Sequence, residues 1–132
     1  MSLQIPENAL VVVVDGAEAR WFTNVGGRDG VTLRQHARTE VQNVDDEGPA
    51  GKVPPRTTES DLDEFTFAKQ VAQELNDGAL KHRYDHLVLV ADPTTLGRIR
   101  PLLHKETQQR LVGDVAKDLT NLPLEDIQRA LS

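Results

Sequence analysis

Three aspartates occupy positions where a metal-dependent reaction could take place. Asp15 and Asp92 each follow a short, strongly apolar run, and Asp118 follows a third, weaker one. If these runs are neighbouring parallel strands, their carboxyl ends meet at one edge of a sheet, where ligands bind in open α/β folds. Carboxylates gathered there could hold Mg²⁺ or Mn²⁺ for phosphodiester hydrolysis. In a plainer interpretation, Asp15 belongs to an Asp-Gly turn and Asp92 caps a helix.

Basic side chains form a second candidate site. Residues 78–110 carry six Lys and Arg side chains against three acidic ones. Such cations could hold phosphate groups without reading a base sequence, and the alternative is that they belong to a solvated surface. No aromatic residue lies between residues 98 and 110, so stacking on single-stranded bases is not supported. The candidates for binding phosphate or a partner are Arg20, Lys52, Arg56, Arg98, Arg100, His104, Lys105 and Arg110.

Composition limits the class of protein. The chain has 132 residues, enough for one domain, and its lack of cysteine excludes disulfides and thiolate chemistry. Fifteen Lys and Arg against 21 Asp and Glu give a net charge of −6, which disfavours a globally basic nucleic-acid binder but allows a local patch. The longest apolar run, 9–14, is far shorter than the roughly 18–20 residues that span a bilayer. With no visible signal peptide, we expect a cytoplasmic protein that does not enter membranes.

The apolar pattern predicts five strands. Residues 9–14 and 86–91 are short β-branched runs typical of strands covered on both faces. Residues 19–25 and 31–41 alternate loosely around the glycine-rich turn 26–30, which predicts an antiparallel meander. Residues 111–117 indicate a final, weaker strand.

Helices are predicted between and after these strands. Ser60 is a candidate N-cap for a helix whose apolar stripe comprises Leu62, Phe65, Ala68, Val71, Ala72, Leu75 and Ala79. The basic residues 81–83 should close it, since helix C-termini favour cations. Asp92 followed by Pro93 predicts the start of the next helix, which Pro101 should kink or restart. A last helix begins near residue 123.

The predicted order is β-β-β-α-β-α-β-α in one domain. It implies an α/β fold with a single mixed five-stranded sheet, helices on both faces, and the fourth strand beside and parallel to the first. Residues 42–60 show no apolar periodicity, contain several Gly and Pro, and exceed the usual length of a connection. We therefore expect a long flexible loop there.

Several short motifs in order resemble the bacterial host-attachment protein family. They cover nearly the whole chain and read VVVVDGAEARWF (11–22), a Pro/Gly loop, HLVLVA (86–91), LG (96–97), LHKE (103–106), LVG (111–113) and KDLT (117–120). That family is similar in fold to the central domain of class I translation release factors. The resemblance implies that the loop 42–60 matches the release-factor loop bearing Gly-Gly-Gln, a motif that this loop lacks.

Three hypotheses of function remain. The favoured one is a non-catalytic binding module that docks on RNA, the ribosome or a protein partner through the loop 42–60 and the basic helix. The second is an enzyme, either a nuclease dependent on Mg²⁺ or Mn²⁺ held by Asp15, Asp92 and Asp118, or a tRNA-ester hydrolase that uses the loop. The third is a protein-interaction regulator of cell attachment, without nucleic acid.

Overall fold

The computed structural model describes residues 5–26, 31–40 and 59–131, with the side chains of 36–40 and 59–65 outside that description. Its elements are β1 (Leu10–Val14), β2 (Glu18–Asn24), β3 (Leu33–Glu40), α1 (Glu59–Leu80), β4 (Leu87–Ala91), α2 (Pro93–Ile99), η3 (Arg100–Leu102, a 3₁₀ helix), α3 (Lys105–Arg110), β5 (Leu111–Ala116) and α4 (Leu124–Leu131). The predicted loop 42–60 lies outside the described residues except for its last two, which belong to α1.

The strands form one mixed five-stranded sheet in the order β3-β2-β1-β4-β5. β1 runs parallel to β4 and β4 parallel to β5, whereas β2 is antiparallel to both β1 and β3. Val14 pairs with Ala91, so the residues that follow them, Asp15 and Asp92, leave the sheet at the same edge. The predicted fold class and the predicted pairing of the first and fourth strands are confirmed.

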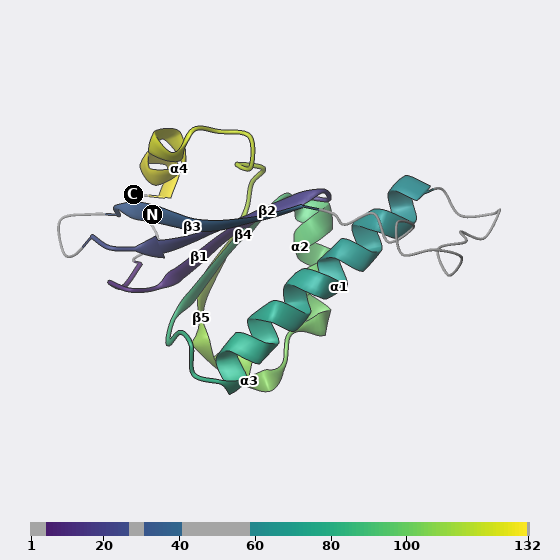
Figure 1. The fold of residues 1–132 in the computed structure, drawn as a ribbon, viewed down its shortest axis with the longest axis horizontal. Coiled ribbons are helices and arrows are strands. Elements are labelled where there is room, and N and C mark those ends of the chain that lie inside the picture. Colours follow the sequence, from purple (N-terminus) through teal and green to yellow (C-terminus); the bar gives the residue numbers. More distant parts are fainter. Residues whose placement is uncertain (1–4, 27–30, 41–58, 132) are drawn as a thin grey trace.

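Helices cover both faces of the sheet (Figure 1). Alternate residues of β1 point to opposite faces, as the strand period of two requires. Val12 packs with residues of α1 and α2, whereas Val11 packs with Ile127 of α4. All four valines from Val11 to Val14 are inaccessible to solvent. This two-sided burial explains why the run is continuously apolar.

The long helix α1 buries the described part of the predicted apolar stripe, but both of its ends differ from the prediction. The buried residues are Ala68, Val71, Ala72, Leu75 and Ala79, whereas the side chains of Leu62 and Phe65 lie outside the described residues. It begins at Glu59, so Ser60 lies inside the helix instead of capping it. It ends at Leu80, before the basic residues that were expected to close it. His82 adopts a left-handed conformation with φ of 56°. The backbone N–H of His82 donates to the Ala79 carbonyl and that of Arg83 to the Gly78 carbonyl, which is the Schellman pattern of helix termination.

The basic segment after β4 forms three short helices where the sequence predicted one that is kinked or restarted. The prediction for Asp92 is confirmed, because its side chain accepts a hydrogen bond of 3.1 Å from the Thr95 backbone N–H and caps α2. Pro101 lies in the first turn of η3, where its missing N–H costs no helical hydrogen bond. Leu103 is extended, and α3 then starts after His104.

Candidate functional site

At the carboxyl edge of the parallel strands, each of the three predicted aspartates accepts a hydrogen bond from a residue two or three positions further along the chain. Asp15 Oδ1 accepts from the backbone N–H groups of Ala17 and Glu18 at 2.7 and 2.8 Å. Asp92 caps α2, and Asp118 Oδ1 accepts from the Thr120 hydroxyl at 2.8 Å. Within residues 5–26, 31–40 and 59–131, no three His, Asp or Glu side chains gather in a group that could hold a metal ion. The geometry of these residues therefore gives the metal hypothesis no support.

Arg20 serves a structural purpose. Its guanidinium donates to the carbonyls of Thr120 and Leu122 at 3.1 and 2.6 Å, and its Nε donates to Gln35 at 3.0 Å. The same group lies 5.1 Å from the centre of the Phe22 ring, a cation–π distance. Arg20 thus ties β2 to the segment before α4.

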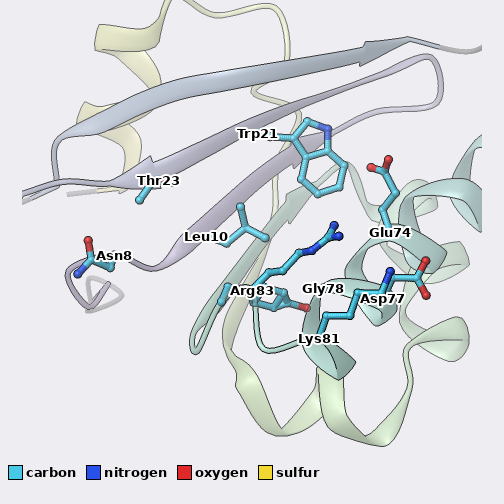
Figure 2. Close-up of a pocket in the computed structure, with 10 residues that line it drawn as sticks. Asn8, Leu10, Trp21, Thr23, Glu74, Asp77, Gly78, Lys81 and Arg83 are labelled. Carbon is cyan, nitrogen blue, oxygen red and sulfur yellow. The ribbon is translucent and has the colours of Figure 1, made fainter.

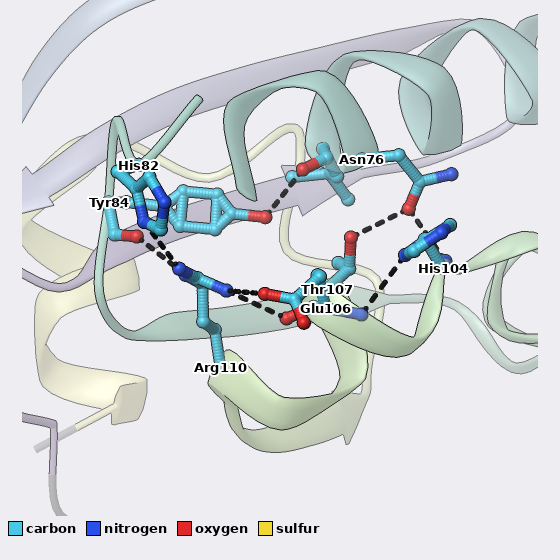
Figure 3. Close-up of polar contacts among 8 residues, drawn as sticks. Asn76, His82, Tyr84, His104, Glu106, Thr107 and Arg110 are labelled. Atoms are coloured by element: carbon cyan, nitrogen blue, oxygen red, sulfur yellow. Dashed lines mark hydrogen bonds and ion pairs between the residues drawn. The ribbon is translucent and has the colours of Figure 1, made fainter. Parts of the chain in front are cut away.

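Arg110 also has its donors engaged within the protein (Figure 3). It donates to the carbonyl of Tyr84 at 3.1 Å and to both the carbonyl and the carboxylate of Glu106, and one of its nitrogens lies 3.0 Å from His82 Nδ1. Its side chain is only 14% exposed. Since the planar guanidinium reaches several acceptors at once, Arg110 joins the segment after α1 to α3.

Asn76 joins α1 to η3 and to the start of α3 (Figure 3). Its Oδ1 accepts from the His104 backbone N–H and from the Thr107 hydroxyl, both at 2.7 Å, and its Nδ2 donates to the Leu102 carbonyl at 3.1 Å. His104 Nδ1 accepts from the Glu106 backbone N–H at 3.1 Å and so caps α3. His104 is therefore held as part of the scaffold.

Three of the predicted cations remain on the surface of the α2–η3–α3 segment. Arg98 is half-buried and already makes an interaction within the protein, whereas Arg100 and Lys105 are exposed. Arg100 Nε lies 3.5 Å from the Asp114 carboxylate, but its side chain is 61% exposed, so this pair holds it weakly. Lys105 forms no ion pair with any described residue. We call Arg98, Arg100 and Lys105 the basic face. Lys52 and Arg56 lie outside the described residues.

A pocket that the sequence reasoning missed lies at the opposite, amino end of β1 and β4. It has a volume of about 410 Å³ and lies between the sheet and the last turns of α1 (Figure 2). Its lining includes Leu10, Trp21, Tyr84 and the charged residues Glu74, Asp77, Lys81 and Arg83. In the sequence, Lys81 and Arg83 indicated only the end of a helix. No local pattern brings these segments together.

Tyr84 also lines this pocket. It is 8% exposed, and its hydroxyl donates to the Leu75 carbonyl at 2.6 Å. Burial raises the pKa of this hydroxyl above its ordinary value, an effect that the nearby Thr107 and Arg110 only partly offset. Gly78 makes room for the ring, since a Cβ there would lie 3.3 Å from the Tyr84 ring.

The family of the chain follows from a match over almost its whole length. Residues 8–131 match the model of bacterial archaeo-eukaryotic release factor family 12, and the chain belongs to that family. The predicted kinship with release factors is confirmed. The family description does not mention host attachment, so that part of the resemblance stays a prediction.

The chain is similar to the type II variant of the Ppx/GppA phosphatase of Aquifex aeolicus, at 14% identity and a TM-score of 0.37 over 81% of this chain. It spans only 34% of that phosphatase. No curated protein matches the chain. Among the described helices, none is both long and apolar enough to cross a membrane.

Proposed function

We propose that this protein is a non-catalytic binding module of the release-factor family that docks on RNA, with the ribosome as its RNA-containing partner. The basic face supplies the contacts, and the loop 42–60 would add to them. The observation that carries the proposal is the charge balance of residues 93–110. Glu106 is the one acidic residue in that stretch, and Arg110 pairs with it at 3.2 Å.

This pairing leaves the remaining charge of the segment positive. Arg98, Arg100 and Lys105 follow one another along three short helices. Asn76 ties η3 and the start of α3 to α1, and Arg110 ties α3 to the segment after α1. Cations on a fixed surface attract phosphate by releasing condensed counterions, and such contacts position a protein on RNA without specifying a sequence. The absence of aromatic residues from this segment agrees with docking on the backbone.

The family supports the same conclusion in two ways. A release-factor fold suggests a partner in the translation apparatus, and this chain contains no Gly-Gly-Gln. A module that keeps the fold without that motif fits binding better than ester hydrolysis.

Arg100→Glu and Arg129→Glu provide a matched test. Both arginines are exposed and both lie near an aspartate, Arg100 at 3.5 Å from Asp114 and Arg129 at 3.7 Å from Asp126, but Arg129 lies on α4 across the sheet. Binding of fluorescent single-stranded RNA and of purified ribosomes is measured between about 50 and 200 mM salt. We expect affinity to fall steeply with salt, and Arg100→Glu to weaken binding and lower the salt dependence by about one phosphate contact. Arg129→Glu should bind like the parent protein.

Two outcomes would contradict RNA docking. One is the absence of RNA and ribosome binding at the lowest salt, and the other is binding that does not change with salt. If affinity capture from cells then recovered proteins without ribosomal components, the interaction would be one of protein with protein.

A further inference from the structure

We propose that the pocket between the sheet and the end of α1 binds a nucleoside monophosphate unit, either as a free nucleotide or as one nucleotide of an RNA strand. This site shares no residue with the basic face, so it extends the proposed function without depending on it. Its volume of about 410 Å³ lies within the range of roughly 300–1,000 Å³ that small-molecule pockets occupy.

The inner wall of the pocket suits a flat, largely apolar group. Trp21 and Tyr84 line it together with Leu10, and the two aromatic residues are only 7% and 8% exposed. Because both rings are fixed and little of either is exposed, they offer a small, preformed apolar surface that a flat group can contact at its edge.

Two cations beside this wall have no partner among the described residues. Lys81 and Arg83 line the pocket, and neither side chain forms a hydrogen bond or ion pair with any residue in the described ranges. The Schellman turn at His82 sends the chain back toward the sheet, and Figure 2 shows the Arg83 guanidinium pointing toward Trp21. A guanidinium and an ammonium on one rim are well suited to a phosphate group.

Two carboxylates balance these cations. Glu74 and Asp77 also line the pocket and are likewise unpaired within the described part of the chain. They would repel a bare anion, but they can accept hydrogen bonds from ribose hydroxyls or from the exocyclic amine of a base. The pocket therefore favours a ligand that carries both a phosphate and hydrogen-bond donors. A nucleotide combines these groups with a flat ring.

The single tryptophan of the chain reports directly on this pocket. Adenosine monophosphate, adenosine and inorganic phosphate are each titrated into the protein, with Trp21 fluorescence and calorimetry as readouts. We expect adenosine monophosphate to bind at least tenfold more tightly than adenosine or phosphate. Arg83→Gln should weaken it about tenfold, as expected for the loss of one charge-assisted hydrogen bond. Arg129→Gln, on the other face of the sheet, should leave binding unchanged.

Competition identifies the source of the nucleotide. If a short oligoribonucleotide with a terminal phosphate displaces adenosine monophosphate, the site accepts a nucleotide of RNA; if it does not, the site takes free nucleotides. No binding of adenosine monophosphate, or equal binding of it by the parent protein and Arg83→Gln, would overturn the proposal. Arg100→Glu should leave the binding of adenosine monophosphate intact, so this test and the RNA-docking test can fail separately.

Discussion

At the scale of single residues, the arginines of this protein serve two different purposes. Arg20 and Arg110 direct their guanidinium groups to backbone carbonyls and hold segments together. Arg83 and Arg100 keep exposed side chains at the surface. The residue type is the same in each case, so the acceptors within reach decide between structural and binding roles.

Tyr84 gives a prediction at this scale. Its folded-state pKa lies above the ordinary value of 10.0, so above that pH the unfolded chain loses a proton that the folded protein retains. The contribution to stability is complete below pH 10 and is lost as the pH rises through the folded pKa. Tyr84→Phe should remove this part of the alkaline loss and should cost about 1 kcal/mol at neutral pH, through the hydrogen bond to Leu75.

Denaturant unfolding at several pH values measures both effects. The lysines titrate in the same alkaline range, but their contribution cancels when the free energies of unfolding of parent and variant are subtracted. Because the chain has one tyrosine, the ultraviolet absorbance of tyrosinate reports the folded-state titration of Tyr84 directly. A titration at or below the ordinary value would contradict the prediction.

At the scale of elements, the joint between α1 and the three short helices positions both candidate surfaces. α2, η3 and α3 are too short to be stable by themselves, since isolated helices need about 12–15 residues. Their stability comes from packing against α1 and from the hydrogen bonds of Asn76 and Arg110. The order of the basic face therefore depends on these contacts between the short helices and α1.

Asn76→Ala tests the joint. The substitution removes three hydrogen bonds and leaves the hydroxyl of Thr107, which is fully buried, without its acceptor. We expect a loss of about 2 kcal/mol in the free energy of unfolding, reduced by roughly 0.5 kcal/mol because alanine favours helix. Asn76→Asp keeps the accepting oxygen and should cost less. Equal losses for the two variants, measured by denaturant unfolding, would show that Oδ1 is not the important group.

At the scale of the whole molecule, the sheet separates two apolar clusters. One lies under α1 and contains Trp21 and Phe67, and the other lies under α4 and contains Phe22 and Ile127. β1 contributes side chains to both, so damage to one cluster should reach the other through this strand. A domain of this size is expected to unfold in one cooperative step.

Ile127→Ala measures that coupling. Ile127 is inaccessible to solvent, and its truncation should cost about 2–5 kcal/mol. Trp21 lies on the other face, and its fluorescence should still report the full loss, with the same midpoint as circular dichroism. If the Trp21 transition kept its parental midpoint, the two faces would be separate folding units.

Local patterns in the sequence determined the elements of this protein. The valine run, the Asp92-Pro93 start and the apolar stripe of α1 depend on residues close together in the chain, and short-range sterics and periodicity govern them. The parallel pairing of the first and fourth strands followed from connection rules. One local prediction, the end of α1, was wrong. The helix ends before the basic residues because His82 adopts a left-handed conformation, which normally favours glycine.

Tertiary structure alone decided which charged groups are available to a ligand. Arg20 meets carbonyls 100 and 102 residues away, and Arg110 meets one 26 residues away, so no local pattern could mark these arginines as structural. The pocket likewise combines Leu10 and Trp21 with residues near the end of α1. Hydrogen bonding and burial depend on which residues lie close together in space. In the folded chain, those residues are often far apart in the sequence.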